Sequence, residues 1–302
     1  MQYLNEEEYN AKIGSWIEIV NEELERLIPK KDTPEKNIYE AMRYSIFAGG
    51  KRIRPVICLA VCEMLGGNQK DVLPFACAIE MIHTYSLIHD DLPAMDDDNY
   101  RRGRLTNHKV FGEATAILAG DALLNTAYEV MMEHALKTEG NMVQKLTAMH
   151  AIAEAAGTSG MIGGQVVDLE SENKIIQKET LHYMHKCKTG ALLKAPAVAA
   201  AILSGASEEQ MSLIEKFGDK TGLAFQIRDD ILDVEGDLAS MGKQTGSDAK
   251  KLKSTYITIY GMEESKRLLN EVTTEADKCL QGFGASAEFL RTLIFKLCSR
   301  NN

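Results

Sequence analysis

The chain has 302 residues, of which 45% are hydrophobic, 34 are Lys or Arg and 44 are Asp or Glu. A hydrophobic fraction of this size excludes an intrinsically disordered chain, and the net charge of −10 argues against nucleic acid or an anionic membrane as a partner. The six cysteines include no CxxC pair, so we expect neither a disulfide nor a cysteine-bound metal. The N-terminus is polar and acidic, and no uncharged apolar run has the length of a transmembrane helix. We therefore expect a cytoplasmic protein without stable membrane association.

Apolar residues recur at spacings of three and four through most of the chain, which is the pattern of amphipathic helices. Prolines, which break helices, number six, and none follows Pro196. The pattern predicts helices over residues 5–27, 34–48, 54–65, 73–92, 113–137, 141–170, 178–205, 207–233 and 262–298. Thr33 is predicted to cap the second of these helices, and the glycine pair at 49–50 to end it. Because the sequence contains no linker, we expect one all-α domain over residues 1–302.

Aspartates concentrate in two short segments. Nine of the 16 aspartates in the chain are Asp90, Asp91, Asp96, Asp97, Asp98, Asp229, Asp230, Asp233 and Asp237. Each group follows an apolar stretch. The first begins at the end of the predicted helix 73–92, which is apolar on most sides and therefore typical of the centre of a bundle. Because neighbouring carboxylates repel one another and resist desolvation, we expect a cation to offset them.

The spacing of these aspartates indicates the kind of cation. Asp229 and Asp233 are four residues apart, so both project from one face of a helix. Asp90 and Asp96 are six apart, and Pro93 between them allows the loop to fold Asp96 back toward Asp90. Oxygen ligands without His or Cys suit Mg²⁺, which substrate phosphates usually complete. The two clusters together therefore predict a site for Mg²⁺ and a diphosphate.

Basic residues accompany both aspartate clusters. They are Lys51, Arg52 and Arg54 beside the glycine turn, Arg101, Arg102 and Arg104 after the first cluster, and Lys243, Lys250, Lys251 and Lys253 after the second. Backbone amides at the glycine turn can also face an anion. The arrangement predicts two anionic substrates, one held through Mg²⁺ and one held directly by Arg and Lys side chains.

Residues 90–96 and 229–233 resemble the two aspartate-rich motifs of the trans-isoprenyl diphosphate synthase family. The resemblance extends over residues 39–256 and includes segments 49–55, 101–103, 163–168, 188–190 and 253–256. The spacing between Asp91 and Asp96 is similar to that of bacterial and plant members, and the chain resembles the bacterial farnesyl diphosphate synthases in particular. One departure is Ile257, where many relatives have Pro.

The resemblance implies an all-α helical bundle of the isoprenoid synthase type with a central active-site cavity, assembled as a homodimer. It also implies head-to-tail condensation of isopentenyl diphosphate with an allylic diphosphate. More than one Mg²⁺ would be held by Asp90, Asp96, Asp229 and Asp233, with weaker roles for Asp91 and Asp168. The allylic diphosphate would bind Arg101, Lys188, Lys243 and Lys253, and isopentenyl diphosphate would bind Gly50, Lys51, Arg54, His83 and Arg102. Thr189 and Gln226 would turn oxygen dipoles toward the allylic cation, and the released diphosphate would take the proton.

Tyr85 is the candidate for the residue that limits product length. It lies five residues before Asp90, which at about 1.5 Å per residue places it roughly 7–8 Å below the metal end of the helix. Its neighbours Thr84 and Ser86 are small, so a growing hydrocarbon chain would stop at the Tyr85 ring, and by resemblance this indicates a fifteen-carbon product. A packed core aromatic is the alternative for Tyr85, as a core position is for His83.

Other functions remain compatible with parts of the pattern. A geranylgeranyl or longer-chain synthase would share every motif. A terpene cyclase needs only one diphosphate site, and the basic segments 51–54 and 101–102 argue against it. A non-catalytic subunit of a partner synthase usually loses one aspartate cluster, whereas both are intact here. We interpret His89 as structural and Asp97 and Asp98 as facing solvent.

Overall fold

The computed structural model describes residues 3–174, 176–235 and 254–299. The helices of these ranges are α1 (Glu6–Leu27), α2 (Lys36–Ile46), α3 (Ile53–Met64), α4 (Gln69–Asp90), α5 (Asn107–Phe111), α6 (Glu113–Lys137), α7 (Met142–Ala156), α8 (Met161–Ser171), α9 (Lys178–His185), α10 (Ala191–Leu203), α11 (Glu208–Glu235), α14 (Tyr256–Tyr260), α15 (Met262–Leu280) and α16 (Glu288–Ser299). A π-helical segment η1 (Lys186–Gly190) joins α9 to α10, and a 3₁₀ segment η2 (Gln281–Ala287) joins α15 to α16. Strands are limited, in these ranges, to the short antiparallel hairpin of β1 (Tyr100–Arg101) and β2 (Arg104–Leu105). The expected all-α fold is confirmed.

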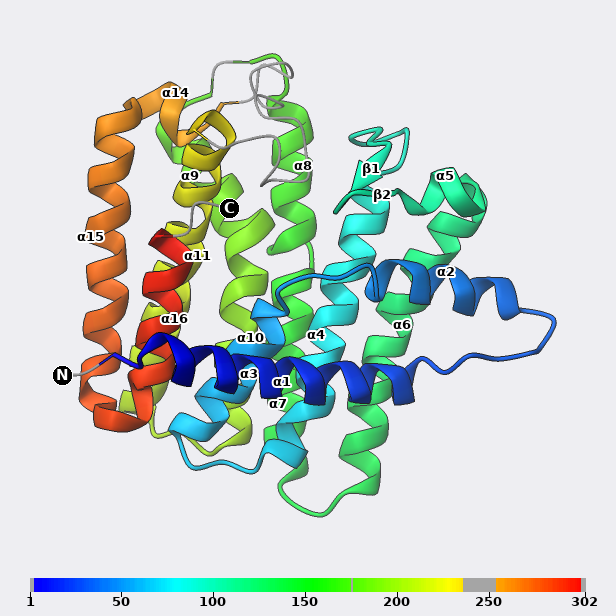
Figure 1. Cartoon of the computed structure of the whole chain (residues 1–302), viewed down its shortest axis with the longest axis horizontal. Coiled ribbons are helices and arrows are strands. Elements are labelled where there is room, and N and C mark those ends of the chain that lie inside the picture. Colours follow the sequence, from blue (N-terminus) through cyan, green and yellow to red (C-terminus); the bar gives the residue numbers. More distant parts are fainter. Residues whose placement is uncertain (1–2, 175, 236–253, 300–302) are drawn as a thin grey trace.

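Helix α4 lies in the middle of the molecule, where it packs against α3, α6 and α10 (Figure 1). Its side chains Phe75, Ile79 and Ile82 are fully buried, as the apolar sequence predicts for a central helix. Among the described residues it is also the one helix long and apolar enough to cross a membrane. However, 67% of its most apolar stretch of 18 residues is buried, which is the environment of a core helix.

The helix boundaries follow local sequence signals at most positions. At the start of α1, the Asn5 side chain accepts a hydrogen bond from the Glu8 amide at 2.9 Å, and the Glu8 carboxylate accepts one from the Asn5 amide at 3.1 Å. Such a reciprocal pair satisfies two amides that have no partner within the helix. The predicted cap at Thr33 is wrong: the Thr33 carbonyl instead accepts from the Lys36 amide, so a turn precedes α2.

Three long predicted helices are interrupted in the structure, and in one of them, 178–205, the interruption is the π-helical segment η1. The segment 141–170 forms α7 and α8, separated by a turn at residues 157–160. At Gly160 a side chain could not fit, because a Cβ atom would lie 2.2 Å from the carbonyl oxygen of Ala155. The segment 262–298 is divided by η2, within which Gly284 has a φ of 62°, a conformation that favours glycine. Periodicity alone does not reveal these breaks because the apolar spacing continues on both sides.

The ends of several elements meet at one end of the bundle. The C-terminal end of α4, the β1–β2 hairpin and α14 all lie at the end drawn uppermost in Figure 1. Helix α1 crosses the bundle near its middle (Figure 1). The polar residues that follow α4 therefore lie at the same end of the bundle as those at the end of α11, although Asp91 and Asp229 are 138 positions apart in the sequence (Figure 1).

Candidate active site

A cavity of about 470 Å³ lies among α3, α4, α6, α8 and η1. Of the residues predicted from sequence, it is lined by Arg54, His83, Tyr85, Asp90, Lys188 and Thr189. The cavity is also lined by the polar side chain of Gln165 and by the apolar side chains of Met161 and Leu124. Polar groups therefore share one cavity with apolar and aromatic side chains, which is the arrangement needed to hold a substrate with a charged head and a hydrocarbon tail.

Asp90 ends α4 at the edge of this cavity. Its backbone carbonyl accepts a hydrogen bond from the Asp96 amide at 2.9 Å, so the loop after α4 folds back as the position of Pro93 predicts. The Gln165 side chain donates to Asp90 Oδ1 at 2.7 Å. The bond fixes the orientation of the Asp90 carboxylate and leaves Oδ2 outside this contact.

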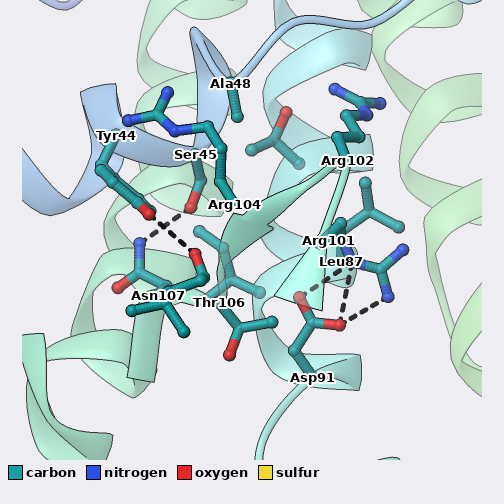
Figure 2. A pocket seen from close by; sticks show the side chains of 13 residues that line it. Tyr44, Ser45, Ala48, Leu87, Asp91, Arg101, Arg102, Arg104, Thr106 and Asn107 are labelled. Atoms are coloured by element: carbon teal, nitrogen blue, oxygen red, sulfur yellow. Dashed lines mark hydrogen bonds and ion pairs between the residues drawn. The ribbon is translucent and has the colours of Figure 1, made fainter. Parts of the chain in front are cut away.

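Asp91 has a different role from that of its neighbour. Its carboxylate is 3% exposed and accepts bonds from Arg101 Nε at 2.8 Å and from Arg101 Nη2 at 2.6 Å (Figure 2). A two-pronged pair of this kind gives strong attraction and a fixed geometry. The cation that offsets Asp91 is therefore a side chain of the protein.

The hairpin that carries Arg101 and Arg102 is attached to α2 by side chains. The Tyr44 hydroxyl donates to the carbonyl oxygen of Leu105 at 2.8 Å, and the Asn107 amide donates to the carbonyl oxygen of Ala41 at 2.8 Å. The Arg104 guanidinium lies over the Tyr44 ring, 4.3 Å from its centroid (Figure 2). These contacts hold a strand pair that would be too short to be stable alone.

Arg102 reaches from this hairpin to the glycine turn before α3. Its guanidinium donates to the carbonyl oxygen of Gly49. A Cβ atom at position 50 would lie 2.6 Å from Arg102 Nη1, and Gly50 has a φ of 131°. A larger residue at position 50 would be strained at this φ and would displace the Arg102 guanidinium, which gives this predicted substrate-binding residue a physical reason.

The three cations after the glycine turn separate into different environments. Arg52 is 5% exposed and donates to Glu80 at 2.7 Å and to the carbonyl oxygen of Ile46 at 2.6 Å, so it is a buried structural residue and does not face an anion site with its neighbours. Lys51 is exposed. Arg54 lines the cavity, and burial lowers its pKa to about 10, so it stays charged at neutral pH.

His83 lies in the same cavity wall, among arginines. Burial lowers its pKa well below the usual value, and the positive charges of Arg54 and Arg102 act in the same direction. The imidazole is therefore neutral at pH 7, and the positive potential around it comes from the guanidinium groups. Such a potential favours an anion.

Lys188 and Thr189 project from the π-helical segment η1. Lys188 Nζ donates to Asp168 Oδ2 at 2.6 Å, so Asp168 on α8 positions a lysine of the cavity wall. Gly164 allows the close approach of α8 to η1, because a Cβ atom there would lie 2.1 Å from the Lys188 amide nitrogen. Asp168 and Lys188, which the sequence predicts at the site, are thus brought together.

The second aspartate cluster divides into residues with different surroundings. Asp230 is 3% exposed and accepts from Gln226 Nε2 at 3.0 Å and from the Tyr256 amide at 2.7 Å. Asp229 is partly buried. Its negative charge raises the pKa of Arg54, so Asp229 lies within electrostatic reach of an arginine that lines the cavity. Asp233, four residues further on α11, is also partly buried. Lys243 and Lys253 lie outside the described residues.

His185 completes the surroundings of Asp230. Its ring stacks on Tyr256 with centroids 5.4 Å apart, and its Nε2 lies 3.8 Å from Asp230 Oδ2. Burial lowers the pKa of His185 to about 4, so the ring is neutral at pH 7. Asp230 on α11 therefore meets side chains or backbone of two other helices, α9 and α14.

The oxygen ligands fit Mg²⁺ better than a metal that prefers nitrogen or sulfur. In the described part of the chain, no three His, Cys, Asp or Glu side chains converge to form a ready-made metal site. Mg²⁺ tolerates few protein ligands, because it keeps waters and takes oxygens from substrate phosphates. Asp90, with one carboxylate oxygen held by Gln165, is the residue here best prepared for such a role.

The family model described as "Polyprenyl synthetase" matches residues 35–285. The chain belongs to the polyprenyl synthetase family. This polyprenyl synthetase is 47% identical over 277 residues to the farnesyl diphosphate synthase of Micrococcus luteus, covering 92% of this chain and 94% of that one. It is 45% identical over 286 residues to the geranylgeranyl diphosphate synthase of Cyanophora paradoxa, with 94% of each chain covered.

Solved structures agree with this assignment. The FPP/GFPP synthase from Zymomonas mobilis superposes with a TM-score of 0.87 at 32% identity, covering 97% of this chain and 99% of that one. The isoprenoid synthase fold expected from the motifs is thus confirmed, and the protein is a prenyltransferase. Synthases named for farnesyl and for geranylgeranyl products match this polyprenyl synthetase almost equally well.

Sequence analysis missed the partners that hold the site together. Glu80, the buried partner of Arg52, is the one charged residue in the apolar run 73–82, and that isolation was a usable signal. The sequence assigned a metal role to Asp229 and none to Asp230, and it did not indicate what Asp230 binds. Its contact with Tyr256 joins positions 26 residues apart, for which no local pattern exists.

Proposed function

We propose that this polyprenyl synthetase condenses isopentenyl diphosphate head-to-tail with dimethylallyl diphosphate and then with geranyl diphosphate to give (2E,6E)-farnesyl diphosphate. The observation that carries the proposal is the cavity, which has Asp90, Arg54 and Lys188 among its polar residues and the aromatic ring of Tyr85 in the same wall. A diphosphate fits the polar residues, and the apolar wall suits a hydrocarbon tail whose length the ring limits.

Asp90, Asp96 and Asp229 would hold Mg²⁺, with Asp233 in support. Bound Mg²⁺ would stabilise the negative charge that develops on the leaving diphosphate of the allylic substrate. We assign the same diphosphate to Lys188, Arg101 and the two lysines outside the described residues, Lys243 and Lys253. Asp91 and Asp168 are engaged with Arg101 and Lys188, so we propose that they position these cations.

Isopentenyl diphosphate would be bound directly by side chains around the glycine turn. Arg54 and Arg102 supply positive charge, and Gly50 leaves the space that Arg102 occupies. His83 would donate a hydrogen bond as a neutral imidazole. Lys51 is the exposed cation of the same turn. Because these groups hold the second substrate, its double bond can attack the allylic carbocation once the first diphosphate leaves.

The remaining residues would protect the cation and guide the proton. Thr189 lines the cavity, where its hydroxyl oxygen can face positive charge. The Gln226 amide nitrogen donates a hydrogen bond to Asp230, since an ionised carboxylate only accepts. The carbonyl oxygen of the Gln226 side chain is therefore left for other partners. The released diphosphate would accept the proton lost from the product, as the family resemblance implies.

Synthesis of geranylgeranyl diphosphate is the second candidate. The observation that favours it is the 45% identity to the Cyanophora paradoxa enzyme of that name over 94% of both chains. The two functions differ only in how far the cavity admits the product. Incubation with labelled isopentenyl diphosphate and geranyl diphosphate distinguishes them, since a farnesyl synthase stops at fifteen carbons. A terpene cyclase would instead consume the allylic substrate without incorporating isopentenyl diphosphate.

Assembly and location are part of the same proposal. We propose one domain over residues 1–302 that works as a homodimer in the cytoplasm. The support is a set of exposed apolar side chains on α6 and α7, two helices that pack against each other: Ile117, Leu118, Met132, Leu136, Val143 and Leu146. Side chains of this kind gathered on neighbouring helices are typical of a protein interface.

The catalytic proposal is tested by two substitutions with a nearby control. Asp90→Asn and Asp229→Asn should each lower kcat at least about a hundredfold with Mg²⁺ present, because each removes a charge needed as the diphosphate leaves. Asp97→Asn is the matched control, since Asp97 lies on the same loop with its side chain 62% exposed. Removal of divalent metal should abolish the wild-type activity. Near-normal turnover of either variant would contradict the assigned roles.

A further inference from the structure

His89 is docked between α4 and α6, next to the cavity. Its Nε2 lies 2.9 Å from the carbonyl oxygen of Ile117 on α6. Because a carbonyl oxygen only accepts, Nε2 carries the proton in this contact. The His89 ring also meets the Tyr85 ring edge-on, with centroids 5.7 Å apart and planes inclined by 77°. One imidazole therefore joins the backbone of α6 to Tyr85, the residue predicted to limit product length.

Gly120 on α6 creates the space for this imidazole. A Cβ atom at position 120 would lie 2.1 Å from His89 Nε2 and 2.4 Å from His89 Cδ2, far inside van der Waals contact. Glycine inside a helix is unfavourable compared with alanine, so its presence in the middle of α6 needs a reason. The docked ring of His89 supplies one.

The Tyr85 ring depends on packing for its position. Its side chain is 6% exposed, and within the described ranges its hydroxyl makes no hydrogen bond. Tyr85, His89 and Leu124 line the cavity together with Asp90. With no hydrogen bond to anchor the ring, an edge contact from His89 is one of the interactions that decide where the ring stands.

We propose that Gly120 and His89 determine product length, because they fix the position of the Tyr85 ring in the cavity. The inference rests on the proposed prenyl transfer and adds two specificity-determining residues to it. Neither residue needs to touch the reacting atoms. Gly120 admits the imidazole, and the imidazole holds the tyrosine.

The two positions should change product length in opposite directions. His89→Ala removes the support, so the Tyr85 ring can move aside and the product can grow longer. Gly120→Ala forces the imidazole away from Ile117 and toward Tyr85 and the cavity, so elongation should stop earlier. In a His89→Ala background the added methyl group at position 120 meets no ring, so Gly120→Ala should then have no further effect.

The experiment measures products of the purified full-length chain with labelled isopentenyl diphosphate and either dimethylallyl or geranyl diphosphate. We expect the ratio of twenty- to fifteen-carbon product to rise at least about fivefold in His89→Ala and in His89→Gln. We expect Gly120→Ala to raise the ratio of ten- to fifteen-carbon product. Gly14→Ala is the matched control, because Gly14 lies inside α1 and a Cβ atom there meets nothing within 4 Å.

Total incorporation is recorded in every reaction. Normal incorporation with wild-type product ratios in the His89 variants would overturn the inference, as would a Gly120→Ala effect that persists without His89. If Gly120→Ala does not fold, the two His89 variants decide the question. Absence of incorporation by the wild-type protein would instead refute the proposed function, so the two failures are distinguishable.

Discussion

At position 50 the absence of a side chain leaves room for the Arg102 guanidinium. Gly50→Ala places a methyl group 2.6 Å from Arg102 Nη1 and displaces that side chain. If Arg102 binds isopentenyl diphosphate, the KM for isopentenyl diphosphate should rise roughly tenfold in this variant. The reason is that a hydrogen bond to a charged group contributes about 1.5–3 kcal/mol. The KM of the allylic substrate should change less. Steady-state kinetics with each substrate varied in turn measures both values.

Gly49→Ala provides the control for this substitution. Gly49 also has a positive φ, 91°, so alanine there carries a similar backbone strain. However, a Cβ atom at position 49 meets nothing within 4 Å. Equal KM increases in the two variants would mean that backbone strain, and not the contact with Arg102, causes the effect.

The buried pair of Arg52 and Glu80 should matter for stability. Arg52→Met leaves Glu80 buried without its partner at 2.7 Å, and breaking such a pair costs about 3–5 kcal/mol. The double variant Arg52→Met/Glu80→Met removes both charges and should recover most of that loss. Urea unfolding of the single and double variants measures the difference. Equal stability of Arg52→Met and the wild type would contradict this assignment.

Among the helices, α14 depends on a carboxylate from α11. Asp230 accepts from the Tyr256 amide, which begins α14, and Asp230→Ala removes that acceptor. We expect faster hydrogen exchange of the amides in residues 256–260, while exchange in α15 stays near its original rate. Asp219→Ala is the control on the same helix, because the Asp219 side chain is 42% exposed and bonds to Lys194. Unchanged exchange in α14 would show that Asp230 does not hold it.

At the same scale, sequence periodicity predicted the helices well and their interruptions poorly. The predicted helix 113–137 has the observed bounds of α6, whereas 141–170 is two helices separated at Gly160. Apolar spacing reports burial, and burial continues through a break when both helices pack on the same core. Breaks depend on backbone contacts, such as the carbonyl of Ala155 against Gly160, that the sequence does not display.

The candidate site shows the same contrast. The sequence motifs predicted that Asp90, Arg54, His83 and Lys188 belong to the site, and all four line one cavity in the structure. The family resemblance gave Asp91 a weaker metal role than Asp90, but the sequence did not indicate that Asp91 pairs with Arg101 while Asp90 binds Gln165. Which of two neighbouring carboxylates turns toward the cavity depends on tertiary contacts, here Gln165 and Arg101.

For the whole molecule, the exposed apolar side chains on α6 and α7 predict a surface for self-association. Leu118→Glu on α6 and Leu146→Glu on α7 place a charge at residues that are 58% and 51% exposed. If the surface is the dimer interface, burying this charge is costly and each variant should sediment as a monomer at concentrations where the wild type is a dimer. Ile19→Glu on α1, 37% exposed and away from this surface, is the control. A wild-type monomer at all concentrations would contradict the proposed assembly.

Product length tests the proposed function most directly, because it depends on substrate binding, on condensation and on the residue that limits chain growth in the cavity. Purified Tyr85→Ala is incubated with geranyl diphosphate and labelled isopentenyl diphosphate, and the products are separated by chain length. We predict that it makes twenty-carbon or longer products, whereas the wild type stops at fifteen carbons. Tyr85→Phe should also stop at fifteen, since the hydroxyl makes no hydrogen bond in the described structure. A Tyr85→Ala enzyme that still stops at fifteen carbons would contradict the proposal that the Tyr85 ring limits product length.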